Sequence, residues 1–334
     1  MSMTFHYSRQ LISHEYLSRN LMSALPPANF TLLLHGGSGR LHPAGTPFPH
    51  EAEYHGTLAA AAQAGFAVLA GGGSSLAAVE TSLRLLEDSP LFNAGRGSVF
   101  SHAGVNEMDA ALMDGATLRA GAVAGVRTVR NPISAARAVL ERSAHVLLTG
   151  AGADQFAAEM GLETAPPAWF RTEERWQQFQ ALQAAAARPA APTTKYGTVG
   201  AVALDQAGHL AAGTSTGGML NKQYGRVGDS PIIGAGTYAN HVCAVSGTGH
   251  GEFFIRHAVA HDIAALMEYR GLSVEAAAHL VIHEKVAPAG GKGGVIALDA
   301  RGHVAMPHST EGLFWAYVSA DGRTGTNVCN MIVE

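Results

Sequence analysis

The chain has 334 residues, of which 47% are hydrophobic and 14% charged, and its formal net charge is −4. This composition supports a sizeable core, and the 22 lysines and arginines are scattered, which excludes a disordered chain and a nucleic-acid-coating protein. No apolar run reaches about 18 residues, so we expect no membrane span.

The N-terminal residues 1–29 predict a polar extension ahead of the folded part of the chain. They lack the apolar core and the cleavage pattern of a secretory signal. The two cysteines, Cys243 and Cys329, are too few for a disulfide framework and fit a reducing compartment. We therefore expect a cytoplasmic protein.

The first half of the chain predicts alternating strands and helices. Thr31–Gly37 is a short apolar run that ends in glycine, which indicates a buried strand. An alanine-rich helix is expected over Glu51–Ala70, and Ser75 is expected to cap the next helix. The pattern then becomes strand-like from Asn106 to Arg130, and Asn131-Pro132 opens another helix.

A loose segment separates the two halves. From about residue 161 to 197 the chain shows no useful periodicity, and we expect a mobile linker there. Beyond it the pattern predicts sheets with helices outside them. The expected strands are 198–205, 209–216, 294–299 and 303–307, and the expected helices are 252–269 and one that starts after a Ser273 cap.

Two segments of the second half share one pattern. They read "ALDQAGHLAAGTST", residues 203–216, and "ALDARGHVAMPHST", residues 297–310. Each predicts a strand, a tight turn at the glycine and a return strand, in an α+β or α/β arrangement of layers.

Several common catalytic motifs are absent from the sequence. It contains no phosphate-binding loop, no dinucleotide fingerprint and no G-x-S-x-G elbow. His257 and His261 have a spacing that could bind zinc on a helix, but no third ligand is evident, so we favour two ordinary histidines.

Glycines and small hydroxyl residues gather instead in the second half. "SGTGHGE", residues 246–252, joins a strand to a helix, where bare backbone N–H groups suit an anion or a developing oxyanion. Arg226 and Asp229 lie three residues apart in a glycine-bounded loop and could hold the carboxylate and ammonium of an amino acid. Their spacing alone favours a solvated ion pair.

With these motifs the chain resembles the plant-type L-asparaginases, also called isoaspartyl peptidases, which are N-terminal-nucleophile hydrolases. The resemblance rests on "YGTVGAVALDQAGHLAAGTSTGGMLNKQYGRVGDSPIIGAGTYA" and on "HGGSG", "SPLFNAGRGSVF", "NEMDAALMDG" and "AVSGTGHGEFFIR", in the family's order. It implies a single four-layer αββα sandwich over residues 30–334.

The resemblance also implies that the chain cuts itself between Gly197 and Thr198, into residues 1–197 and 198–334. A threonine hydroxyl is a weak nucleophile until a base takes its proton, and the freed α-amino group of Thr198 would be that base. The residues with implied roles are Thr216 beside the nucleophile, Asn93 as its buttress, Thr248 and Gly249 as the oxyanion hole, and Arg226, Asp229, Gly249 and Gly251 around the substrate.

The implied reaction is hydrolysis of L-asparagine and of β-aspartyl (isoaspartyl) dipeptides, without a catalytic cofactor. Two alternatives stay open: a glycosylasparaginase-type amidase, and a relative that binds a ligand but never cuts itself. The resemblance further implies a homodimer of the two-chain unit. It also implies a structural sodium ion held by backbone carbonyls of Leu86, Glu87, Ser89, Phe92, Ala94 and Arg96.

Overall fold

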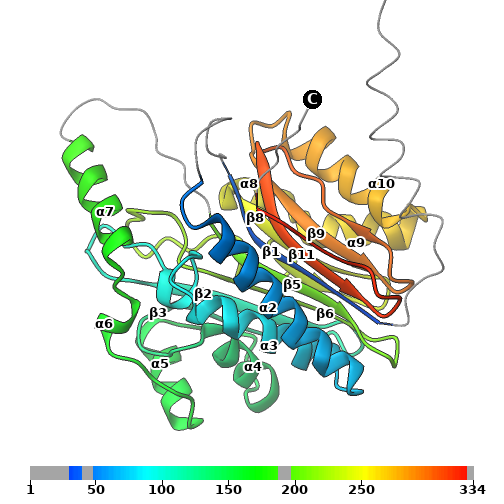
Figure 1. Ribbon diagram of the computed structural model, residues 1–334, viewed down its shortest axis with the longest axis horizontal. Helices are drawn as coiled ribbons and strands as arrows, with labels where there is room; N and C mark the ends of the chain where they lie inside the picture. The colour runs from blue at the N-terminus through cyan, green and yellow to red at the C-terminus, as the bar shows by residue number, and fades with distance from the viewer. Residues whose placement is uncertain (1–29, 40–47, 187–196, 329–334) are drawn as a thin grey trace, which may run out of the picture.

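Two stacked β-sheets form the centre of the computed structural model, which describes residues 30–39, 48–186 and 197–328 (Figure 1). The larger sheet has the strand order β12-β11-β1-β5-β6-β2-β3-β4, and the smaller has the order β10-β9-β8-β7. The larger sheet comprises β1 (Thr31–Gly39), β2 (Met108–Asp114), β3 (Ala120–Val126), β4 (Leu147–Thr149), β5 (Val199–Leu204), β6 (Leu210–Thr216), β11 (Gly312–Ser319) and β12 (Thr324–Asn327). The smaller comprises β7 (Thr237–Ala239), β8 (Cys243–Gly249), β9 (Gly293–Asp299) and β10 (Val304–Ala305).

Helices cover the outer face of each sheet, so the molecule has four layers (Figure 1). The larger sheet carries α2 (Glu51–Ala70), α3 (Ser75–Asp88) and α4 (Pro132–Arg142). The smaller carries α8 (Gly251–His257), α9 (Val259–Arg270), α10 (Val274–His279) and the π-helical turn η2 (Leu280–Val286). The αββα sandwich implied by the resemblance is confirmed.

Three apolar layers hold this sandwich together. One lies between the larger sheet and its helices, with Leu34, Leu83 and Leu112 at its centre. A second lies between the smaller sheet and its helices, and the third fills the space between the sheets. Burial of apolar surface in these layers is the main source of stability. None of the described helices is both long and apolar enough to cross a membrane.

The two similar segments of the sequence form two similar hairpins, β5–β6 in the larger sheet and β9–β10 in the smaller. At the first turn Asp205 accepts hydrogen bonds from the N–H groups of residues 207 and 209, at 3.0 and 2.9 Å. Asp299 does the same with residues 301 and 303, at 2.8 and 2.9 Å. The shared sequence pattern therefore reflects two turns that are stabilised by the same aspartate hydrogen bonds.

Three expectations about local structure need correction, and one is confirmed. The cap of α3 is Ser74, whose side chain accepts from the Ala77 N–H at 3.3 Å, because the helix already begins at Ser75. The helix expected over 252–269 is two helices, since Ala258 adopts a left-handed conformation with φ of 47° between α8 and α9. Ser273 caps α10 as expected. Strand β5 begins at Val199, one residue after Thr198.

The largest correction concerns the expected linker. Between 161 and 186 the chain forms α6 (Pro167–Phe170) and α7 (Glu173–Ala186), which lie at one side of the molecule (Figure 1). Trp176 and Phe179 of α7 pack on Phe100, with ring centroids 5.1 and 5.8 Å from its own. This packing holds α7 in place although its sequence carries no strong helical periodicity. The rest of the linker, residues 187–196, and the N-terminal extension lie outside the described residues.

Candidate active site

Thr198 lies at the N-terminal end of β5, in a buried position next to β6. The register pairs Val199 with Ser215, which brings Thr198 level with Thr216 on the neighbouring strand. The Thr198 hydroxyl donates to the Thr216 hydroxyl at 3.1 Å, and Thr198 is only 8% exposed. The expected pair of threonines therefore meets at the end of the central strands.

The carbonyl oxygen of Gly197 accepts two hydrogen bonds from side chains. Asn93 Nδ2 donates to it at 2.8 Å, and Thr216 Oγ1 donates to it at 3.2 Å. Asn93 is itself fixed, because its Oδ1 accepts from the Val99 N–H at 2.9 Å and its Nδ2 also reaches the Gly218 carbonyl at 2.8 Å. These two donors polarise the carbonyl of the bond that joins residues 197 and 198.

Strand β1 brings the oxyanion-hole candidates to the same place. Gly37 has φ of 110°, and a Cβ there would lie 3.3 Å from the backbone nitrogen of Thr198, so only glycine suits this position. The next residue, Ser38, donates its N–H to Thr248 Oγ1 at 3.3 Å and its hydroxyl to the Thr248 carbonyl at 3.1 Å. Because the Thr248 hydroxyl oxygen accepts a hydrogen bond from the Ser38 N–H, the Thr248 hydroxyl proton can be donated to another acceptor. Gly249 follows at the end of β8.

The expected substrate clamp also assembles. A Cβ on Gly251 would lie 2.7 Å from Arg226 Nη2 and 3.0 Å from Asp229 Oδ1, so these three residues meet at the start of α8. Arg226 is paired here, since its Nε and Nη2 donate to the Glu252 carboxylate at 2.9 and 3.1 Å. The guanidinium thus already binds a carboxylate in the bidentate geometry that a substrate carboxylate would require.

Asp229 is the most unusual carboxyl group of this cluster. It is 5% exposed, and its Oδ2 atom is buried without a hydrogen-bond partner among the described residues. Burial raises the pKa of Asp229 to about 7. A buried acceptor that lacks a donor, beside an arginine, suits a site that receives an ammonium group.

The loop expected to bind sodium turns back tightly on itself. A Cβ on Gly95 would lie 2.3 Å from the Glu87 carbonyl oxygen, and one on Gly97 would lie 2.0 Å from the Phe92 carbonyl oxygen. Two glycines therefore leave room at these carbonyls, and the oxygen donor set fits a hard cation. Arg96 does not crowd this cradle, because its guanidinium lies over the Trp169 ring, 4.6 Å from the centroid.

Several residues of this region were missed from the sequence. His35 lies beneath the nucleophile strand, where its Nε2 is 3.0 Å from Ser246 Oγ, and burial lowers its pKa to about 3. Lys222 is buried and donates to the Glu107 carbonyl at 2.8 Å. For Glu87 only the backbone carbonyl was expected to act, in the sodium loop; its side chain is buried, which raises its pKa to about 8. His35 and Lys222 stand within quoted blocks of the resemblance, but nothing in those blocks predicted their buried side-chain contacts, since contacts between distant segments leave no local pattern.

The two histidines considered for zinc do not form a site. His257 ends α8 and His261 lies in α9, on opposite sides of the break at Ala258. Across the described ranges no group of three or more His, Cys, Asp or Glu side chains could hold a metal ion.

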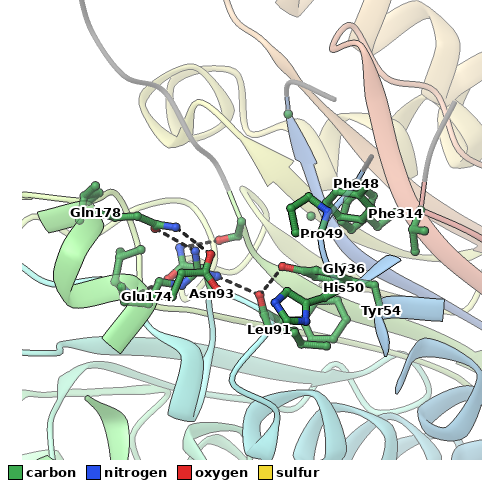
Figure 2. Close-up of a pocket in the computed structure, with 18 of the residues that line it drawn as sticks. Gly36, Phe48, Pro49, His50, Tyr54, Leu91, Asn93, Glu174, Gln178 and Phe314 are labelled. Carbon is green, nitrogen blue, oxygen red and sulfur yellow. Dashed lines mark hydrogen bonds between the residues drawn. The ribbon is translucent and has the colours of Figure 1, made fainter. Parts of the chain in front are cut away.

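A cavity of about 570 Å³, which Figure 2 shows around Asn93, is lined in part by Gly197. Its inner wall includes Gly37, Asn93 and Gly197, and its outer walls come from the start of α2, from strand β11 and from α7. The outer walls carry the aromatic residues Phe48, Tyr54 and Phe314 on one side and the polar residues Glu174, Arg175, Gln177 and Gln178 on the other.

Comparison with known proteins identifies a family for this fold and site. The family model described as asparaginase matches residues 28–328. An isoaspartyl peptidase of Salmonella typhimurium is 49% identical over 88% of this chain and 97% of its own. A probable isoaspartyl peptidase/L-asparaginase 2 of Arabidopsis thaliana is 38% identical over 88% and 97%, and an isoaspartyl peptidase/L-asparaginase of Rattus norvegicus is 42% identical over 81% and 82%.

Proposed function

The chain belongs to the asparaginase family, and we propose that it is an autoprocessing amidohydrolase with Thr198 as its nucleophile. Its substrates would be L-asparagine, released as aspartate and ammonia, and β-aspartyl dipeptides. The observation that carries the proposal is the convergence of Thr198, Thr216 and Asn93 on the Gly197 carbonyl.

Maturation would begin with attack of the Thr198 hydroxyl on the Gly197 carbonyl carbon. The C–N bond breaks as the acyl group moves to oxygen, and the Thr198 nitrogen becomes a free amine. Asn93 and Thr216 stabilise the developing oxyanion through the hydrogen bonds that they already make to this oxygen. Water then hydrolyses the ester, which leaves a Gly197 carboxylate and a free Thr198 hydroxyl.

Hydrolysis would reuse the same hydroxyl on the substrate's side-chain amide. The Thr198 amine, with an ordinary pKa of about 7.7–8.0, takes the hydroxyl proton and passes it to the leaving nitrogen. Thr248 and the Gly249 N–H stabilise the tetrahedral oxyanion. The amine then activates the water that releases aspartate.

Substrate recognition would use the clamp at the start of α8. Glu252 has a half-exposed side chain and would yield Arg226 to the substrate α-carboxylate. Asp229 and the Gly251 backbone would receive the α-ammonium group. Both asparagine and β-aspartyl dipeptides carry these two groups, which accounts for a single site with two substrates.

We also propose that the carbonyls of the 86–96 loop hold a sodium ion, which would stiffen the turn that carries Asn93. Replacing sodium chloride by choline chloride at equal ionic strength should then lower the Tm. An unchanged Tm would contradict a structural sodium ion.

For the assembly and location of the enzyme, we propose a cytoplasmic dimer of the two-chain unit. Light scattering on the purified protein should give twice the mass of one chain. A mass of one chain would contradict the dimer.

The activity itself is tested with Thr198→Ala. We expect the wild-type enzyme to release ammonia from asparagine and leucine from β-aspartyl-leucine, and Thr198→Ala to do neither, because the nucleophile and its amine are both lost. Thr57→Ala, a change on the surface of α2, should keep both activities. A fully active Thr198→Ala variant would refute the proposed nucleophile, and activity on sugar-linked asparagine alone would favour a glycosylasparaginase.

A further inference from the structure

The direction in which the substrate's leaving group departs follows from the site geometry, given the proposed function. The tetrahedral carbon carries four groups: the Thr198 oxygen, the oxyanion, the aspartyl carbon and the leaving nitrogen. The oxyanion faces Thr248 and Gly249, and the aspartyl carbon leads to Arg226 and Asp229. The leaving nitrogen must take a proton from the Thr198 amine, so it lies against that amine.

The 570 Å³ cavity reaches Gly197, the residue that precedes Thr198, although Thr198 itself is not among the residues that line it. The nitrogen is bonded to Gly197 in the uncut chain, and a Cβ on Gly37 would lie 3.3 Å from it. Gly37 and Gly197 both line the cavity. A group that leaves beside the Thr198 amine, on the side of Gly37 and Gly197, therefore departs toward this cavity.

The cavity is too large for ammonia and carries an aromatic wall. One water molecule occupies about 30 Å³ in the liquid, and ammonia is of similar size. Three half-buried rings contact one another on the outer wall: Phe48 lies 5.1 Å from Tyr54 and 5.7 Å from Phe314, and Tyr54 lies 5.5 Å from Phe314, centroid to centroid. Figure 2 shows these rings on the side of the cavity opposite the α7 residues Glu174 and Gln178.

The residues that line the cavity include both acidic and basic side chains, so the cavity carries no charge of a single sign. His50 is paired with Glu53 at 2.8 Å, and Glu174 offsets the charge of Arg175. The guanidinium of Arg175 also donates to the Leu91 and Gly97 carbonyls, each at 2.9 Å. Selection by charge is therefore weak, and the exposed aromatic carbons of the outer wall dominate what the cavity can bind.

We propose that this cavity is the leaving-group subsite and that it binds a bulky apolar or aromatic residue released from a β-aspartyl dipeptide. With β-aspartyl-phenylalanine the amide C–N bond breaks, the Thr198 ester forms, and phenylalanine leaves with the proton from the amine. Water then converts the ester to aspartate. The enzyme should thus favour β-aspartyl-phenylalanine over β-aspartyl-glycine and over asparagine in kcat/KM.

Phe314→Ala in the full, matured enzyme tests this subsite. We expect the ratio of kcat/KM for β-aspartyl-phenylalanine to that for β-aspartyl-glycine to fall roughly tenfold, the size of effect that a truncated hydrophobic pocket produces. The kcat/KM for asparagine should stay within about twofold, since ammonia does not reach the wall. Phe314 pairs with Gly37 across β1 and β11, so Phe48→Ala, outside the sheet, provides a second variant with the same expected result.

Phe30→Ala is the matched control. Phe30 is a half-buried aromatic residue just before β1, at the end away from the cavity, and it packs on Phe66 at 5.2 Å between centroids. Its loss should leave the ratio unchanged. Equal kcat/KM values for the two dipeptides in the wild-type enzyme, or an unchanged ratio in Phe48→Ala and Phe314→Ala, would overturn the subsite. Loss of every activity in the wild-type enzyme would instead refute the proposed function.

Discussion

At the scale of single residues, Asp229 links substrate binding to stability. Its carboxyl group is buried, and burial raises its pKa to about 7 from an ordinary value of 3.8. A folded-state pKa above the unfolded one means that the folded protein binds the proton more tightly. The stability that this group contributes is present at low pH and is lost as the pH rises from about 4 to about 7. Ionisation of the buried Asp229 carboxyl therefore destabilises the folded protein, and a bound ammonium group offsets this loss of stability.

Asp229→Asn should remove this pH dependence. The parent for this test is Thr198→Ala, which should stay uncut and unfold as a single chain. Between pH 5 and pH 8 the free energy of unfolding of this parent should fall by about 2–3 kcal/mol relative to that of the variant that also carries Asp229→Asn. Denaturant titrations at both pH values measure this difference, with Asp114→Asn, at a surface turn, as the charge control. Parallel pH profiles for the parent and Asp229→Asn would show that the buried carboxyl does not titrate in this range.

The site residues differ in how far the sequence predicts them. Thr198, Thr248 and Arg226 stand in glycine-rich blocks whose order matches the family, so their positions could be predicted. Glu252 as the partner of Arg226 could not, because that pair forms only when the 226–229 loop folds against the start of α8. Two adjacent serines, Ser74 and Ser75, could each cap α3, and residue type does not distinguish them. The cap is decided by the backbone conformation of the first turn, where the helix begins at Ser75.

At the scale of elements, α7 is tied to the loop that carries Asn93. Arg175 donates to the carbonyls of Leu91 and Gly97, which flank Asn93. Tyr54 donates to the same Leu91 carbonyl at 2.8 Å, as Figure 2 shows. The helix thus fixes both ends of the turn from which Asn93 reaches the Gly197 carbonyl. We expect α7 to position this turn during maturation.

Arg175→Ala tests that role. Losing two hydrogen bonds from a partly exposed guanidinium should weaken the hold on the turn by about 1–2 kcal/mol, and self-cleavage should slow roughly tenfold. Arg171→Ala, which removes a guanidinium stacked on Trp176, is the control and should cleave at the normal rate. The half-time of cleavage on denaturing gels is the measurement, and the Tm shows whether the fold is equally stable. Equal half-times for Arg175→Ala and the wild-type chain would exclude a positioning role.

Helix α7 is also an element that the sequence did not predict. Residues 173–186 read as linker because they lack a clear apolar face, and α7 is held by a few contacts such as Trp176 on Phe100. Strong periodicity elsewhere, as in α3, predicted helices well. Helix α7 owes its place to tertiary contacts, which outweigh weak local signals.

At the scale of the whole molecule, the sandwich places segments from distant parts of the chain around one bond. Asn93 comes from the turn after α3, Gly37 from β1, Thr216 from β6 and Thr248 from β8. Gly37, Thr216 and Thr248 lie near the ends of central strands, and Asn93 lies in the loop that follows α3. The repeated pattern of residues 203–216 and 297–310, with its tight turn at the glycine, predicted the two hairpins. Only the stacking of the two sheets brings the ends of β5 and β8 together.

The most direct test of the central claim is the intact mass of the purified chain under denaturing conditions after incubation. Two polypeptides are expected, residues 1–197 and 198–334, with Thr198 at the new N-terminus. A single polypeptide that stays near 34.6 kDa after long incubation, or a cut at any other bond, would contradict Thr198 as an N-terminal nucleophile.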